Sequence, residues 1–182
     1  GGFFGFFRFV TAGRGGVGAV MGSKGIKAIV LDPAGTPVIR KPKNAEAFKA
    51  ASRAFAQGLS SHPVCGTGLP AYGTNVLVNI LNEAGGLPTK NFSVGRFEGA
   101  DKICAETMVE IQKRRGGNPT HGCHRGCIMK CSGICVDENG EFVSKQPEYE
   151  TVWSHGAHCG VDDLDKIILC DRLEDDYGLD TI

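Results

Sequence analysis

Residues 134–143 read Ile-Cys-Val-Asp-Glu-Asn-Gly-Glu-Phe-Val, two short apolar runs on either side of a polar turn. The Asn139-Gly140 pair favours the left-handed backbone that a tight hairpin turn requires. We therefore predict two antiparallel strands, over 134–136 and 141–143. Helical patterns lie on both sides of this hairpin, so the sequence after about residue 43 predicts a mostly helical region.

The helical segments are indicated by their caps and by apolar residues at helical spacing. Asn44 has the side chain of an N-cap, and Gly178 has the backbone freedom of a C-terminal cap. In the third helix Cys104 falls on the apolar face, so we expect it in the core. The expected helices run from Asn44 to Gly58, over 75–83, over 101–113, from near Glu150, and over 163–177.

The first 42 residues have a different pattern, in which apolar runs alternate with glycine. We predict a buried strand over 1–10, a glycine loop over 12–25 and a second strand over 26–31. Because a buried strand is an unusual start for a chain, we expect residues to precede Gly1. The sequence thus predicts an α+β fold with a domain boundary near Pro42.

The composition excludes several kinds of partner. Lys and Arg together number 20, as do Asp and Glu, so no net field attracts nucleic acid or anionic lipid. The apolar start contains Arg8 and is too short to span a membrane. Eight cysteines without secretory context favour thiol or metal chemistry in the reducing cytoplasm. Oligomeric state is not indicated by any pattern.

Three cysteines stand at regular four-residue intervals just before the hairpin, in the segment Gly-Cys-His-Arg-Gly-Cys-Ile-Met-Lys-Cys over 122–131. Thiolates at this spacing can surround one soft metal centre, because the short loops between them let the backbone turn around it. An iron–sulfur cluster is therefore the first interpretation of Cys123, Cys127 and Cys131. Structural zinc with Cys135 as fourth ligand, or buried thiols without a metal, are the alternatives.

The glycine loop contains the pattern G-x-G-x-x-G over 13–18, which is typical of dinucleotide-binding turns. The long helix that should follow is interrupted by Gly22 and Gly25, so a dinucleotide site is not favoured. Bare N–H groups and the Arg14 guanidinium still suit a phosphate. A tight loop between packed strands is the alternative.

Carboxylates near two helix ends are further candidates. Asp175 and Asp180 flank the end of the last helix, where they are either solvated or accept hydrogen bonds from the N–H groups of a pterin or purine. Glu150 either complements a helix dipole or carries a proton. His158 would lie on the same helical face as Glu150, with Ser154 between them.

Taken together, these segments resemble the aldehyde ferredoxin oxidoreductase family of tungsten enzymes. The motifs that carry the resemblance occur in the family's order at 12–24, 82–92, the cysteine triplet, 147–151 and 175–180. The resemblance implies that 1–42 is the carboxyl-terminal part of a β domain that covers the cofactor. Residues 43–182 would be the amino-terminal part of a helical domain that carries the iron–sulfur ligands and a pterin-binding motif.

The resemblance also implies the residues of the site. The cofactors would be a [4Fe–4S] cluster, a tungsten or molybdenum bis-pterin, and a Mg²⁺ ion that bridges the pterin phosphates. The implied roles are cluster ligands for Cys123, Cys127 and Cys131; pterin contacts for Asp175, Leu179 and Asp180; phosphate and magnesium contacts for Ala12, Gly13, Arg14, Gly15 and Gly16; and proton transfer near the metal for Glu150 and His158.

The implied reaction is the oxidation of a small aldehyde to a carboxylic acid, with electrons passing through the cluster to ferredoxin. Two departures from the family pattern affect this expectation. Cys123 and Cys127 are separated by three residues, whereas the better-known members have two residues between these cysteines. His158 stands where many members have an asparagine. The alternatives are a low-potential reductase like benzoyl-coenzyme A reductase and a stand-alone iron–sulfur or zinc module. The fourth cluster ligand would lie outside the chain or be Cys135.

Overall fold

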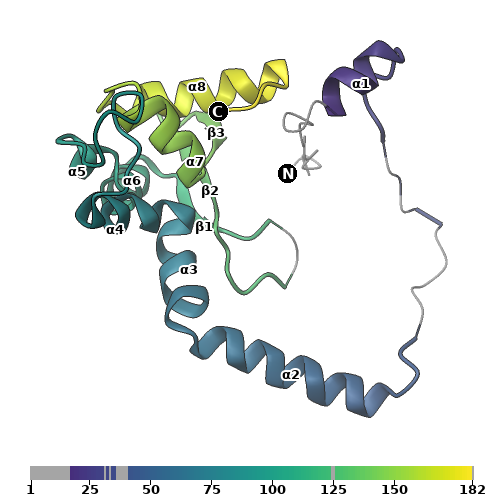
Figure 1. The fold of residues 1–182 in the computed structure, drawn as a ribbon. Coiled ribbons are helices and arrows are strands. Elements are labelled where there is room, and N and C mark those ends of the chain that lie inside the picture. The colour runs from purple at the N-terminus through teal and green to yellow at the C-terminus, as the bar shows by residue number, and fades with distance from the viewer. Residues whose placement is uncertain (1–16, 31, 33, 36–40, 124–125, 182) are drawn as a thin grey trace.

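The computed structural model describes residues 17–30, 32, 34–35, 41–123 and 126–181 (Figure 1). The predicted strand over 1–10 and the start of the glycine loop lie outside these residues. Helix α1, Val17–Ser23, replaces the rest of the predicted loop. The strand predicted over 26–31 is wrong for the described residues 26–30, which have no strand structure. A strand needs a hydrogen-bonded neighbour, and no described segment pairs with this one.

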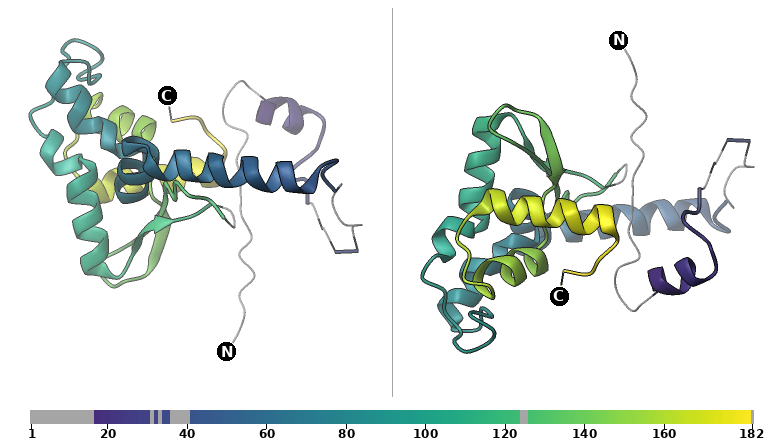
Figure 2. Two further views of the ribbon diagram at one scale, coloured as in Figure 1. Left: turned by 90° about the horizontal axis from the view of Figure 1, so that it is seen from below. Right: turned by 90° about the horizontal axis from the view of Figure 1, so that it is seen from above.

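Helix α2, Ala45–Ser61, begins where predicted but continues past Gly58. The side chain of Asn44 accepts a hydrogen bond from Ala47 N at 3.0 Å, as expected of an N-cap. Glycine inside a helix costs only about 1 kcal/mol, so it need not end one. No residue of α2 is buried, and Figure 2 shows the helix extending away from the packed part of the chain.

The helix predicted over 75–83 is confirmed by α4, and a series of short helical segments precedes it. The chain passes through π-helical and 3₁₀ turns before α4, which ends at Gly85 with a φ of 74°. The segments are η2, Pro63–Gly68; α3, Leu69–Tyr72; η3, Gly73–Val76; and α4, Leu77–Ala84.

The helix predicted over 101–113 is broken at Cys104 into α5, Ala100–Ile103, and α6, Ala105–Arg115. Cys104 has an extended backbone with a ψ of 167°, and its thiol lies 3.2 Å from the Asp101 carbonyl oxygen. This local bond replaces the helical hydrogen bonds at that point. Cys104 is 4% exposed, so its predicted place in the core is confirmed.

The predicted hairpin is confirmed by β2, Ser132–Val136, and β3, Phe142–Lys145. A third strand, β1, Asn118–His121, pairs antiparallel with β2 and gives the order β1-β2-β3. Its sequence, Asn-Pro-Thr-His, contains a proline and lacks apolar alternation, so no strand was predicted there. Proline is tolerated because β1 is an edge strand.

The carboxyl-terminal part of the fold is α7, Tyr149–Val152, followed by π-helical η4, Trp153–Ala157, and α8, Leu164–Tyr177. The prediction for α8 is confirmed at both ends, because Asp163 caps its start and Gly178 ends it with a φ of 69°. Helix α8 packs on β3, while α6 packs on β1 and β2. The fold is thus a mixture of helices with a small antiparallel sheet.

One apolar core joins α4, α5, α6, α7, η4 and α8. Its most completely enclosed members include Val78, Leu87, Ile103, Met108 and Ile167, each 0% exposed. The core holds α7 and η4 against α8, and this arrangement positions the cavity described next. Among the described residues, no helix is both long and apolar enough to cross a membrane.

Candidate active site

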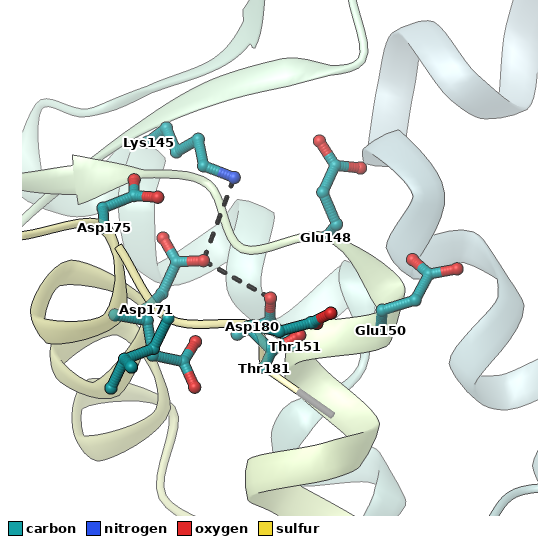
Figure 3. A pocket seen from close by; sticks show the side chains of 10 residues that line it. Lys145, Glu148, Glu150, Thr151, Asp171, Asp175, Asp180 and Thr181 are labelled. Carbon is teal, nitrogen blue, oxygen red and sulfur yellow. Dashed lines mark hydrogen bonds and ion pairs between the residues drawn. The ribbon is translucent and has the colours of Figure 1, made fainter. Parts of the chain in front are cut away.

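A cavity of about 470 Å³ lies where α7, the end of β3 and the carboxyl end of α8 meet (Figure 3). Most of its lining side chains are carboxylic acids, accompanied by one lysine. Such a lining would suit a ligand rich in hydrogen-bond donors or a cation. The lining residues are Lys145, Glu148, Glu150, Thr151, Asp171, Glu174, Asp175, Leu179, Asp180 and Thr181.

The cavity brings together several of the candidate residues from distant parts of the chain. Glu150 lies in the first turn of α7, whereas Asp175, Leu179 and Asp180 lie at and beyond the end of α8. Ser154 donates a hydrogen bond to the backbone carbonyl of Glu150 at 2.7 Å, which fits the predicted four-residue relation between them.

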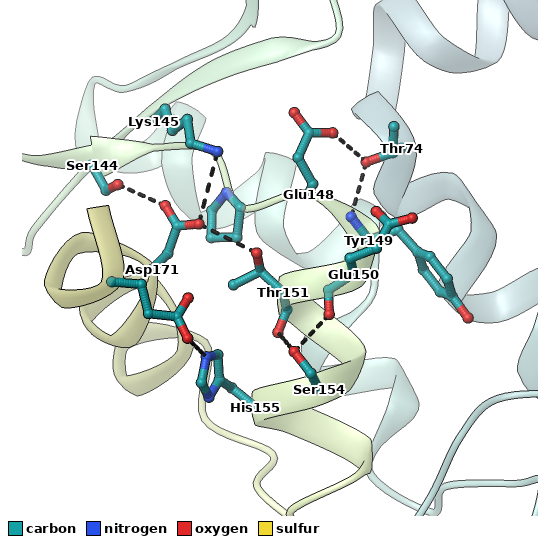
Figure 4. A network of polar contacts seen from close by, with 12 residues as sticks. Thr74, Ser144, Lys145, Glu148, Tyr149, Glu150, Thr151, Ser154, His155 and Asp171 are labelled. Atoms are coloured by element: carbon teal, nitrogen blue, oxygen red, sulfur yellow. Dashed lines mark hydrogen bonds and ion pairs between the residues drawn. The ribbon is translucent and has the colours of Figure 1, made fainter. Parts of the chain in front are cut away.

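Asp171 is the most deeply buried acid of the cavity, with 3% exposure. Its carboxylate accepts hydrogen bonds from the hydroxyls of Ser144 at 2.8 Å and Thr151 at 3.4 Å, and Lys145 Nζ lies 3.9 Å away (Figure 4). Burial raises the pKa of Asp171, and the charge of Lys145 opposes that shift. Asp171 therefore holds its proton more readily than an ordinary aspartate does.

A second polar pair lies beside the cavity on the same helices. His155 Nε2 is 2.5 Å from Glu174 Oε1, so η4 and α8 are joined by a short hydrogen bond (Figure 4). Glu174 Oε2 is buried and has no hydrogen-bond partner in the described structure. This oxygen is an open acceptor at the wall of the cavity.

His158 is not among the residues that line the cavity. Its ring stacks on Trp153, with centroids 5.8 Å apart and 12° between planes, and it meets the edge of Phe92. Its Nε2 lies 3.2 Å from Asn91 Oδ1. The His158 amide bonds to Trp153 O, five residues back, so this π turn changes the helical face that was predicted for His158.

The three cysteines lie in the segment between β1 and β2, and all are half-buried. Burial raises the pKa of the Cys131 thiol, and the negative charge of Glu148 raises it further. Among the described residues, no group of three or more His, Cys, Asp or Glu has the geometry to hold a metal ion. Cys135 is fully buried in β2, and burial raises its pKa to about 12.

The loop residues Ala12, Gly13, Arg14, Gly15 and Gly16 lie outside the described part of the chain. Other residues of the site were missed from sequence, namely Asp171, Glu174, His155 and Lys145. A signal for Asp171 exists, because it stands four residues before Asp175 and so lies on the same face of α8. No comparable local signal indicates the contact between His155 and Glu174.

Comparison with known proteins identifies the family. The model of the family described as aldehyde ferredoxin oxidoreductase, domains 2 & 3, matches residues 50–182. The tungsten-containing aldehyde ferredoxin oxidoreductases of Pyrococcus furiosus and Thermococcus kodakarensis are 43% and 42% identical over 173 and 175 residues. Both matches cover 94% of this chain and 27% of the relative.

A more distant relative is an aliphatic sulfonate oxidoreductase, WOR-like subunit, of Pyrococcus furiosus, which is 27% identical over 178 residues. That match covers 94% of this chain and 26% of the relative. The chain therefore belongs to the aldehyde ferredoxin oxidoreductase family. It spans about a quarter of the length of the curated relatives it matches.

Proposed function

We propose that this chain forms part of a tungsten pterin oxidoreductase, with molybdenum as the alternative metal. The enzyme would oxidise an aldehyde to a carboxylic acid and pass electrons through a [4Fe–4S] cluster to ferredoxin. The observation that carries the proposal is the cavity, which joins Glu150 to Asp175, Leu179 and Asp180 in a chain of this family. Glu150 would then lie within reach of whatever the acids at the end of α8 hold.

The chemistry of the cavity fits a pterin. A pterin carries amino and ring N–H groups, which are donors, and the cavity wall consists mainly of carboxylate acceptors. The buried oxygen Glu174 Oε2 lacks a donor among the residues that the structure describes, as expected of a site completed by a ligand. Asp175 and Asp180 would hold the ring, and the backbone N–H groups from Ala12 to Gly16 would approach its phosphates and Mg²⁺.

The cysteine segment fits an iron–sulfur cluster. Cys123, Cys127 and Cys131 would supply thiolates, since these are the ligands that such clusters use. The raised pKa of Cys131 belongs to the thiol without a metal, and bound iron would favour its thiolate form. The buried Cys135 would remain outside the ligand set, so the fourth ligand would come from another part of the protein.

The reaction balances as aldehyde plus water giving carboxylic acid, two protons and two electrons. Bound tungsten would supply the two-electron oxidation chemistry. The Glu150 carboxylate would accept one of the protons at a side-chain oxygen. Asp171, which burial keeps more readily protonated, would hold a proton at the far wall of the same cavity.

The test uses the full-length protein purified with its cofactors. We expect tungsten or molybdenum, iron and pterin in the preparation, together with aldehyde-dependent reduction of ferredoxin. Glu150→Gln should lower kcat at least tenfold with unchanged metal content, while the exposed Glu141→Gln should have no effect. A protein that holds the metals but oxidises no aldehyde would disprove the proposed reaction.

A histidine near the metal would favour the alternative function, a low-potential reductase. His158 packs on Trp153 instead of lining the cavity, so this alternative has less support. Reduction of an aromatic coenzyme A thioester by the full-length protein, in place of aldehyde oxidation, would favour it. Membership of the family also favours an enzyme over a stand-alone metal-binding module.

A further inference from the structure

Two consecutive residues at the start of η3 contact both the cysteine segment and the cavity. The first is Gly73, on which the backbone of Cys131 packs directly. A Cβ atom at Gly73 would lie 3.0 Å from the carbonyl oxygen of Cys131 and 2.9 Å from Gln146 Nε2. Gln146 in turn donates to the carbonyl of Tyr72 at 3.1 Å. The position of Cys131 is therefore fixed against this short segment.

The second residue is Thr74, which holds Glu148. Its hydroxyl donates to Glu148 Oε2 at 2.6 Å and accepts a hydrogen bond from Tyr149 N at 2.9 Å (Figure 4). Because both functions of the hydroxyl are used, its direction is fixed. The neighbouring Asn75 strengthens the attachment by donating to the carbonyl of Pro147 at 2.7 Å.

The carboxylate of Glu148 is directed away from the helix that it precedes. An acid at this N-cap position ordinarily accepts a backbone N–H of the first turn, but the Glu148 side chain makes no capping hydrogen bond. It turns instead to Thr74 and lines the cavity (Figure 3). Because Cys131 packs on Gly73 and the adjacent Thr74 holds Glu148, this negative charge lies beside the segment that fixes Cys131.

We propose that Glu148 sets the reduction potential of the cluster held by Cys131, and that Thr74 is the residue that positions it. The proposal depends on the proposed function, in which Cys131 is a cluster ligand. Reducing a cluster adds negative charge, so a fixed carboxylate nearby disfavours reduction and lowers the potential. Because Glu148 also lines the cavity, one carboxylate links the electrostatics of the two proposed cofactor sites.

The test is a redox titration of the cluster, followed by electron paramagnetic resonance, in the full-length protein with its cofactors. Glu148→Gln removes the charge and keeps the shape of the side chain. At the potential where the cluster of the wild-type protein is half reduced, we expect the ratio of reduced to oxidised cluster to be about tenfold higher in Glu148→Gln. This change corresponds to a 59 mV higher reduction potential for one electron. Glu148→Asp, which keeps the charge, should shift the potential less.

Two further variants test the role of Thr74. Thr74→Val releases the Glu148 carboxylate and should move the reduction potential toward that of Glu148→Gln. Thr74→Ser keeps the hydroxyl and should leave the potential unchanged. The exposed Glu141→Gln controls for loss of one charge. The proposal is overturned if Glu148→Gln holds full iron at an unchanged potential, or if Glu141→Gln shifts it equally. Absence of iron from the unchanged protein would overturn the proposed function and this inference together.

Discussion

His155 Nε2 and Glu174 Oε1 lie 2.5 Å apart and join η4 to α8, while the second carboxylate oxygen of Glu174 is buried without a partner in the described structure. The pair is mostly enclosed, with side-chain exposures of 25% for His155 and 13% for Glu174. A buried acceptor that loses its donor carries the full cost of its lost hydration. This contact therefore stabilises the fold as well as the cavity wall.

Replacing His155 by phenylalanine should destabilise the protein, because Glu174 would then lose the donor that His155 provides. We expect a loss of about 1–3 kcal/mol, measured as a lower midpoint of urea unfolding at constant m-value. Glu174→Leu and the double variant complete a double-mutant cycle. Strictly additive effects would show that the two side chains do not interact.

Replacing Asp171 by asparagine should change the pH dependence of stability. Burial raises the pKa of this acid in the folded state, so its stabilising contribution is present below the ordinary aspartate pKa and is lost as pH rises through the folded value. Relative to Asp171→Asn, the wild-type protein should therefore lose stability as the pH rises above the ordinary aspartate pKa of about 3.9. Urea unfolding across this range measures the difference.

Asp137 provides a control of opposite sign. Backbone N–H groups, chiefly that of Glu141, lower its pKa in the folded state. Its contribution is present above the ordinary aspartate pKa and is lost as the pH falls. The unchanged protein should gain stability relative to Asp137→Asn as the pH rises. Parallel curves for both variants would contradict these assignments.

The parts of the fold that were predicted correctly depend on strong local signals. Gly140 and Gly178 have φ values of 81° and 69°, which glycine adopts without strain, and they mark the hairpin turn and the end of α8. Asp163 and Asn44 cap helices through hydrogen bonds to residues two or three positions ahead. Such contacts join residues that are close in the sequence, so a short stretch of sequence is enough to predict them.

The parts that were not predicted depend on distant contacts or on irregular helices. Asp171 is 27 residues from Ser144 and 20 residues from Thr151 in the sequence, so its contacts with them depend on the packing of α8 against the sheet and α7. The π turn of η4 adds a residue to the helical repeat, so His158 turned to Trp153 instead of following Glu150. Local patterns indicated the acids at the ends of the cavity but not the polar network between them.

Cys135 should be dispensable for the metal centre. Its side chain is fully buried in β2, whereas Cys123, Cys127 and Cys131 are half-buried in the segment that precedes this strand. We expect Cys135→Ala to retain all the iron of the full-length protein and to lose about 1 kcal/mol of stability. Cys131→Ala is the matched comparison and should lose iron. Loss of iron from Cys135→Ala would make it the fourth ligand.

Replacing Gly73 by alanine should displace Cys131 and so reduce the iron content of the full-length protein. Gly73 has a φ of 64° and a ψ of −162°, a region that is essentially restricted to glycine, so backbone strain alone costs about 1–3 kcal/mol. The added methyl group would also meet the Cys131 carbonyl oxygen at 3.0 Å. Gly160 separates these effects, because its φ is 71° but no described atom lies within 4 Å of the place that its methyl group would take. Gly160→Ala should lower stability and keep its iron, whereas equal iron loss in both variants would show that the contact with Cys131 has no special role.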